Sequence, residues 1–190
     1  MRIVVLAGGL SMERNVSLSS GNKICRALRS RGHQAILVDM FLGFEDYEGK
    51  LDDVFDAPDG FCGDYSVAEA EPDLAAVRAS RKDQSRSMFG TGVLDVCAKA
   101  DIVFLALHGT CGEDGRVQAA FDLLGIPYTG AGYLSSAIAM DKDIAKRLFQ
   151  LEGIPVASSY TVYKHNASSY TFKQITDRMG LPCFVKPANA

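Results

Sequence analysis

The chain has 190 residues, of which 47% are hydrophobic and 23% are charged, and its formal net charge is -3. A chain of this length and composition can bury a substantial core, which excludes general disorder. The small negative net charge excludes a broad attractive field for nucleic acid, so any phosphate group would have to be held by local lysines and backbone amides. We therefore expect no nucleic-acid partner.

The cysteine content and the terminal sequence indicate the compartment. The five cysteines include no CxxC pair, and an odd count without such spacing indicates neither a disulfide framework nor a zinc site. The apolar run at the amino terminus is too short for a signal peptide, and no run is long enough to span a bilayer. We expect a cytoplasmic protein with no membrane partner.

The first part of the chain is typical of an α/β protein. Arg2 to Ala7 is predicted as a buried strand, a helix with Gly21 on its apolar stripe is expected from about Ser17 to Ser30, and Gln34 to Asp39 is predicted as a second strand. Together they predict a right-handed βαβ unit. The turn that begins at Gly8 lacks the GxGxxG spacing, which does not support a nicotinamide or flavin cofactor.

An acidic insertion is expected at about residues 41–92. Between Phe41 and Asp73 the only basic residue is Lys50, a composition typical of solvated loops. Leu74 to Arg86 is predicted as a short charged helix, and Val93 to Ala98 is expected to lead into the next strand. We expect the insertion to decorate the edge of the sheet and not to build the core.

The central strand of the sheet is predicted at Ile102 to Leu107, an unbroken apolar run. It ends at His108, and Cys111, Glu113 and Asp114 follow in a glycine-rich loop. Ligands of open α/β sheets bind beyond the carboxyl ends of the strands, so this loop is a predicted site. We expect Glu113 and Asp114 to shape the loop and cap the following helix.

A Gly-apolar-Pro signal recurs at residues 125–127, 153–155 and 180–182. Glycine adopts the left-handed helix cap and proline prevents continuation, so each signal predicts the end of a helix. Asp141 is a predicted N-cap. The chain stops within an element pattern, so we expect it to be part of a longer protein. The predicted helices are 116–124, 141–152 and 168–179, and the predicted strands are 128–129, 158–163 and 183–186.

Four segments carry a resemblance to the D-alanine:D-alanine ligase family, which belongs to the ATP-grasp enzymes. The resemblance implies an α/β fold: a Rossmann-like, parallel-sheet, pre-ATP-grasp domain over residues 1–130, followed by the start of an ATP-grasp central domain over residues 131–190. The segments are AGGLSMERNVSLSSG at 7–21, LHGTCGEDGRVQ at 107–118, GIPYTGAGYLSSAIAMDKDIAKRL at 125–148 and LPCFVKPANA at 181–190.

The resemblance implies an ATP-dependent ligase of peptidoglycan precursor synthesis. The carboxylate of one D-alanine attacks the γ-phosphate of ATP, and the amine of a second D-alanine then attacks the acyl phosphate. It also implies Mg²⁺, with its ligands beyond Ala190, and a homodimer formed through the amino-terminal domain. This chain alone is expected to be inactive. D-Alanine, D-lactate and D-serine all remain open as second substrate.

The resemblance also implies roles for individual residues. Glu13 matches the glutamate that holds the substrate ammonium, although a glutamate there could simply favour the positive end of the helix. His108 matches a histidine near the substrate and the transferred phosphoryl group, although it could be a satisfied histidine at a strand end. Lys142 and Lys186 match lysines that contact ATP phosphates, although a lysine at the position of Lys142 is usually solvated. Ser11 could offer a hydroxyl to the substrate.

Other readings stay open from the sequence. Ser17, Ser19 and Ser20 could also offer hydroxyls, and helix capping explains Ser17 equally well. A standalone module that binds a D-amino acid or forms a dimer without chemistry is an alternative function. A hydrolase with Cys111 as nucleophile and His108 as base is a further alternative, although residues so close along a loop rarely face each other.

Overall fold

The computed structural model describes residues 1–67 and 70–189. Contacts divide the chain into two compact units, Met1–Ala137 and Ile138–Ala190. The predicted insertion at 41–92 and the predicted second domain at 131–190 each include residues outside the described set, namely 68–69 and 190.

The first unit is built on a parallel sheet of three strands in the order β2-β1-β3. Strand β1 (Arg2–Ala7) lies between β2 (Gln34–Asp39) and β3 (Ile102–Leu105). The predicted α/β class with a parallel sheet is therefore confirmed, and the bounds of β1 and β2 are those expected. Residues 128–129 extend beside β3 through a single parallel bridge at Tyr128.

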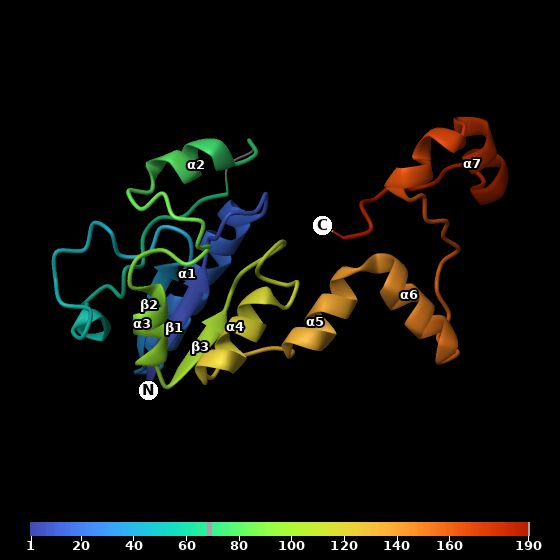
Figure 1. Ribbon diagram of the computed structural model, residues 1–190. Helices are drawn as coiled ribbons and strands as arrows, with labels where there is room; N and C mark the ends of the chain where they lie inside the picture. The colour runs from blue at the N-terminus through green and yellow to red at the C-terminus, as the bar shows by residue number, and fades with distance from the viewer. Residues whose placement is uncertain (68–69, 190) are drawn as a thin grey trace. The chain divides into compact units, whose positions relative to one another are not determined.

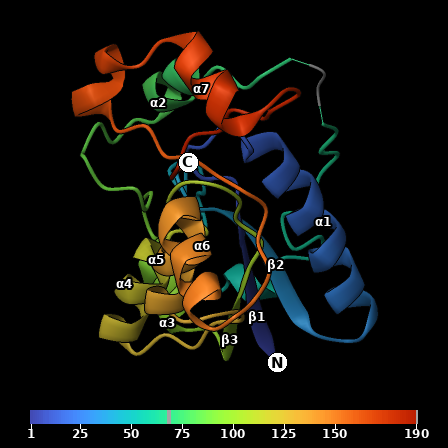
Figure 2. The same ribbon diagram turned by 90° about the vertical axis from the view of Figure 1, so that its right-hand side faces the viewer.

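Helices cover both faces of this sheet, as Figures 1 and 2 show. Alternate side chains of β1 point to opposite faces, because strand residues alternate. Val5 packs in the cluster that includes residues of α1 (Arg14–Ser30), whereas Val4 packs in the cluster that includes residues of α3 (Val93–Ala98) and α4 (Arg116–Leu124). Only the ends of the strands remain open to a ligand.

Helix α1 begins at Arg14, earlier than the predicted start at Ser17. Helix capping was one of two readings of Ser17, but its hydroxyl is buried and bonds to the Gly8 N–H and the Ala106 carbonyl. Gly21 faces the sheet, as predicted from its position on the apolar stripe of the helix. A Cβ at this position would lie 2.7 Å from Ala7 Cβ and 3.1 Å from Leu37 Cδ1, so glycine permits the close approach of helix and sheet.

The segment before β3 is helix α3, whereas the sequence predicted only that residues 93–98 lead into the strand. Val93, Val96 and Cys97 are buried at helical spacing, which places one apolar face on the sheet. Strand β3 ends at Leu105, before the predicted Leu107, because its pairing with β1 ends there. The helix α4 has the predicted bounds, and Gly125 is its left-handed C-cap.

The acidic insertion contributes to the core, contrary to expectation. It contains the short 3-10 helix η1 (Val54–Asp56) and helix α2 (Leu74–Ser80), which is shorter than predicted. Val54 and Phe55 are buried in the same cluster as α3 and α4. The insertion also covers the outer edge of β2, since the Leu37 N–H donates to the Gly60 carbonyl at 2.8 Å.

The second unit is helical among its described residues. Helix α5 (Tyr133–Met140) runs across the boundary between the units, and α6 (Lys142–Leu151) and α7 (Phe172–Met179) follow, with the 3-10 helix η2 (Lys164–Ser169) between them. Asp141 caps α6 as predicted, with Oδ1 accepting the N–H groups of Asp143 and Ile144 at 3.0 Å.

Several predictions for the second unit were wrong. Helix α7 begins at Phe172, after the expected Ser168, because Thr171 and Gln174 form a capping box. The segments 158–163 and 183–186 are not strands, since neither pairs with another segment within the described chain. Helix α5 was not predicted.

The second unit has no core of its own: none of its described residues is buried. Apolar side chains such as Leu148, Phe149 and Leu151 of α6 are between 41% and 81% exposed. Within residues 1–67 and 70–189, no helix combines the length and apolarity that a membrane crossing requires.

Candidate ligand-binding site at the strand ends

The turn between β1 and α1 forms the first wall of the site. Gly8 and Gly9 have φ values of 74° and 77°, which allow the chain to turn sharply after the strand. The buried hydroxyl of Ser17 accepts the Gly8 N–H at 2.8 Å and donates to the Ala106 carbonyl at 2.7 Å. This single hydroxyl joins the carboxyl ends of β1 and β3.

The predicted site residues Ser11, Glu13 and His108 come together at this edge. The Ser11 hydroxyl donates to the His108 carbonyl at 2.8 Å. A Cβ on Gly109 would lie 3.1 Å from Glu13 Oε2 and 3.4 Å from Ser11 Cβ, so both side chains lie against the loop that follows β3. Segments far apart in sequence thus form one local surface, because β1 and β3 are parallel neighbours.

Glu13 is the N-cap residue of α1, but its side chain makes no capping hydrogen bond. The side chain is exposed, and among the described residues it has no hydrogen-bond or ion-pair partner. Its carboxylate is therefore available to a ligand, in a place where the helix N-terminus favours negative charge.

The imidazole of His108 lies between two polar side chains. Nε2 is 3.4 Å from the Ser20 hydroxyl, and Nδ1 is 3.8 Å from Glu113 Oε1. The ring is 36% exposed, so a ligand can reach it. Of the serines considered from the sequence, Ser11 and Ser20 contact His108. Ser11, Ser17 and Ser19 are buried, and Ser20 is partly exposed.

Acidic side chains shape the loop after His108, as predicted. Glu113 Oε2 accepts the Gly109 N–H at 2.8 Å, and Asp114 accepts the N–H groups of Cys111 and Arg116. The N-cap position of α4 is Gly115, which has no side chain. Asp114 nevertheless accepts the N–H of Arg116, the first residue of the helix, whereas Glu113 bonds within the loop.

The thiol of Cys111 has a different neighbour from the one a hydrolase needs. Its Sγ is 3.8 Å from Nη1 of Arg116, and this contact is the main cause that raises the pKa of Arg116. In the described part of the chain, no hydrogen bond joins Cys111 to His108. A nucleophile without a base in contact lacks the activation that covalent catalysis requires.

Sequence reasoning missed the ion pair of Arg14 and Asp39 beneath the β1–α1 turn. Arg14 is 6% exposed and donates to the Gly9 carbonyl and to the Asp39 carboxylate. One signal could have found it: a basic residue in the first turn of a helix opposes the helix dipole, so it needs another partner. The sequence did not reveal that this partner is the last residue of β2.

Lys142 and Lys186, the predicted ATP-contacting lysines, both belong to the second unit. The Lys142 N–H donates to the Ala188 carbonyl at 2.8 Å, beside an antiparallel bridge between Asp141 and Asn189. The start of α6 therefore lies next to the segment that follows Lys186. Lys186 is exposed and Lys142 is half-buried.

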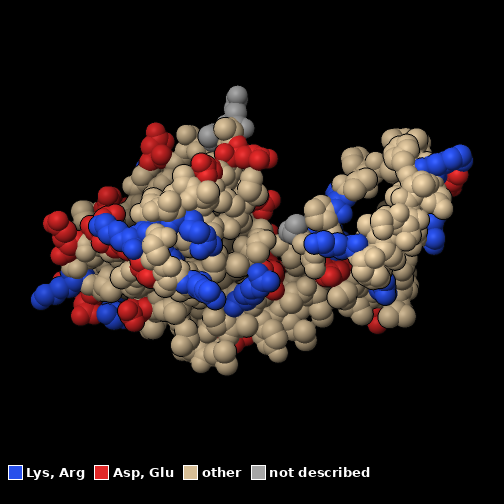
Figure 3. Space-filling model, turned by 45° about the horizontal axis from the view of Figure 1, so that its top comes forward, with Lys and Arg blue, Asp and Glu red and all other residues tan. Residues whose placement is uncertain are grey.

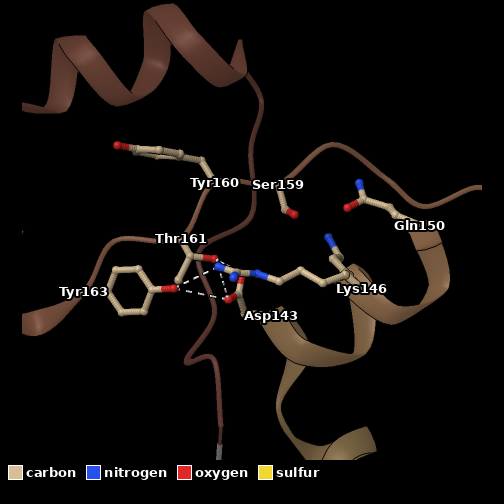
Figure 4. A pocket seen from close by; sticks show the side chains of 8 residues that line it. Asp143, Lys146, Gln150, Ser159, Tyr160, Thr161 and Tyr163 are labelled. Atoms are coloured by element: carbon tan, nitrogen blue, oxygen red, sulfur yellow. Dashed lines mark hydrogen bonds and ion pairs between the residues drawn. The ribbon is translucent and has the colours of Figure 1, made fainter.

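A polar hollow lies on the same helix, as Figure 4 shows. Asp143 accepts a hydrogen bond from the Thr161 hydroxyl at 2.7 Å and pairs with Arg147 at 2.7 Å, while the Tyr163 hydroxyl is 3.3 Å away. The Thr161 hydrogen bond, with the Arg147 charge, lowers the pKa of Asp143. These contacts attach the segment around Thr161 to α6, next to Lys142.

The described residues do not supply a metal site. Among residues 1–67 and 70–189, no group of three or more His, Cys, Asp or Glu side chains could hold an ion. On the face drawn in Figure 3, acidic and basic side chains are intermixed. The chemistry available at the strand ends is thus a free carboxylate, a serine hydroxyl and an imidazole.

The fold and this edge define an α/β protein with polar side chains gathered beyond the carboxyl ends of its strands. Residues 2–131 match the family model described as "D-ala D-ala ligase N-terminus". The chain belongs to this family, which confirms the resemblance drawn from the four segments.

Similar proteins agree with this assignment. The chain is 44% identical over 190 residues to a D-alanine--D-alanine ligase of Lacticaseibacillus casei, covering 100% of this chain and 51% of the relative. It is 48% identical over 158 residues to that of Pediococcus pentosaceus, covering 83% of this chain and 45% of the relative. The crystal structure of D-alanine--D-alanine ligase from Bacillus anthracis complexed with ATP matches with a TM-score of 0.63 and 28% identity, over 100% of this chain and 48% of that one. The chain spans about half the length of these relatives.

Proposed function

We propose that the complete protein is an ATP-dependent ligase that joins two D-alanine molecules for peptidoglycan precursor synthesis. The observation that carries the proposal is the meeting of Ser11, Glu13 and His108 at the strand ends of a chain that belongs to this family. The relative from Lacticaseibacillus casei is named D-alanine--D-alanine ligase, and its match covers the whole of this chain. Residues 1–130 would form the substrate domain, and residues 131–190 would begin the ATP-grasp central domain.

Glu13 holds the ammonium group of the first D-alanine. Its carboxylate is exposed and unpartnered within the described residues, and a charge-assisted hydrogen bond to an ammonium contributes about 1.5–3 kcal/mol. Ser11 offers a hydroxyl to the same molecule. His108, with one ring nitrogen beside Ser20 and the other facing Glu113, orients the substrate carboxylate that attacks the γ-phosphate.

Lys142 and Lys186 bind the phosphates of ATP and neutralise their charge, since phosphoryl transfer depends mainly on positioning and electrostatics. The backbone contact between Lys142 and Ala188 supports a joint role for the two segments. The family resemblance places the ligands of Mg²⁺ beyond Ala190. We further propose that the complete protein is cytoplasmic and forms a homodimer through its amino-terminal domain.

The experiment compares dipeptide formation by the complete protein and its Glu13→Gln variant. The variant is expected to lose about 10-fold or more in kcat/KM at low D-alanine, because the amide carries no charge for the ammonium. Glu48→Gln, which changes another exposed glutamate of the first unit, serves as the control and is expected to keep normal activity. Near-normal ligation by Glu13→Gln would contradict the role of Glu13, and D-alanine binding by the wild type without ligation would favour a non-catalytic module.

A further inference from the structure

The side chain of Arg14 carries a buried charge that is both paired and hydrogen-bonded. Nη1 donates to the Gly9 carbonyl at 2.6 Å and to Asp39 Oδ1 at 3.1 Å, while Nη2 pairs with Asp39 Oδ2. Burying a guanidinium is unfavourable unless it is paired and hydrogen-bonded. The two-pronged contact with Asp39 meets this need and also fixes the orientation of the side chain, because the guanidinium fork is rigid.

Asp39 connects this ion pair to the end of β2. Its Oδ1 also accepts the N–H groups of Phe41 at 2.9 Å and Leu42 at 3.2 Å, so the carboxylate is held in place by the chain that follows the strand. A Cβ on Gly8 would lie 2.8 Å from Asp39 Oδ2. The carboxylate therefore lies directly against the β1–α1 turn, with only a glycine able to occupy the contact.

Glu13 stands at the other end of the same turn. The Arg14 N–H donates to the Ser11 carbonyl at 3.1 Å, and the Ser17 N–H donates to the Glu13 carbonyl at 2.9 Å, so residues 11 to 17 form a continuous hydrogen-bonded turn and helix start. No side-chain contact within the described residues holds the Glu13 carboxylate itself. Its position therefore depends on the backbone of the turn, which the Arg14–Asp39 pair supports from beneath.

We propose that Arg14 and Asp39 are positioning residues: by clamping the Gly9 carbonyl to the end of β2, they fix Glu13 and Ser11 where the first D-alanine binds. The inference rests on the proposed function of Glu13 as the ammonium partner. Arg14 and Asp39 are assigned no direct contact with the substrate and act through the turn. Arg14 is neutralised by Asp39, which leaves the neighbouring Glu13 carboxylate to the ligand.

The kinetic test uses Arg14→Met and Arg14→Lys in the complete protein. Arg14→Met is expected to raise the KM for the first D-alanine about 10-fold or more with a smaller change in kcat, because a displaced Glu13 loses a charge-assisted hydrogen bond. Arg14→Lys keeps the positive charge and one donor group, so its KM for the first D-alanine should lie between the values of Arg14→Met and the wild type. An unchanged KM in a folded Arg14→Met variant would overturn the proposal.

Arg29→Met is the matched control, because Arg29 belongs to the same helix and its guanidinium also binds backbone carbonyls. It donates to Ala35 at 2.8 Å, Ala57 at 3.2 Å and Pro58 at 2.6 Å, at the end of α1 away from Glu13. Its loss should lower the melting temperature and leave the KM unchanged. An equal rise in KM for Arg29→Met would show general destabilisation and would refute a specific positioning role.

A second measurement separates this inference from the proposed function. Hydrogen exchange of the 190-residue chain reports the turn without any activity. Amides of residues 9–13 should exchange faster in Arg14→Met and at the wild-type rate in Arg29→Met. If the wild type forms no dipeptide, the proposed function fails; if exchange at residues 9–13 is the same in Arg14→Met and the wild type, the positioning inference fails.

Discussion

Replacing Gly21 by alanine sets two effects of opposite sign against each other. Within a helix, alanine is favoured over glycine by about 1 kcal/mol. The added methyl, however, would lie 2.7 Å from Ala7 Cβ and 3.1 Å from Leu37 Cδ1, both in the sheet beneath α1. Relieving these contacts requires the helix to move away from β1 and β2, and such overpacking costs about 1–3 kcal/mol. We expect Gly21→Ala to destabilise the first unit by up to about 2 kcal/mol.

The assay is urea unfolding of the 190-residue chain followed by far-ultraviolet circular dichroism. Lys23→Ala, on the exposed side of the same helix, is the control and should change the free energy of unfolding by less than about 0.5 kcal/mol. A double variant, Gly21→Ala with Ala7→Gly, moves the methyl group from the strand to the helix and removes the closest contact. It should be more stable than the sum of the single changes predicts, by about 1 kcal/mol.

A Gly21→Ala variant at least as stable as the wild type would refute this reasoning, because helix propensity would then outweigh the contact with the sheet. Strict additivity in the double variant would also contradict it. In that case any loss of stability in Gly21→Ala would come from a source other than the contact with Ala7.

Two further predictions concern a buried thiol and the second unit. Burial raises the pKa of Cys97 from 9.0 to about 12. Because the pKa is higher in the folded state than in the unfolded state, the protonated thiol contributes its full stabilisation below pH 9. This stabilisation is lost as the pH rises toward 12. The free energy of unfolding should therefore fall by up to about 1.4 kcal/mol more per pH unit in the wild type than in Cys97→Ala, and equal slopes would contradict this. The amides of α6 should exchange much faster than those of β1, since no described residue of the second unit is buried; equal protection would count against it.

The elements predicted best from sequence are those whose burial is complete. β1 and β2 are short apolar runs bounded by glycine or charge, and their predicted bounds agree with the structure. Helix α3 was missed because six residues carry too little periodicity to separate a buried helix from an extended segment. The predicted strands of the second unit failed because a strand forms only with a partner, which a local pattern does not reveal.

The candidate site also contains residues that the sequence predicted and residues that it did not. The resemblance assigned Glu13 and His108 to one substrate site, and the described chain places them at the same edge of the sheet. The ion pair between Arg14 and Asp39 was not predicted, because it depends on how deeply both side chains are buried beneath a turn. The spacing of residues along the chain does not reveal this depth. The catalytic and binding roles of the predicted residues remain predictions.

The hydrogen bond between the Gly8 amide and Ser17 has a consequence for which ligands this fold can accept. In many α/β proteins the turn after the first strand offers free amides to a phosphate at the start of the helix. Here the Gly8 amide is already engaged by Ser17, and a carboxylate stands at the N-cap of α1. Because a carboxylate already stands at the N-cap, the start of α1 disfavours an anion at the position where related architectures bind one.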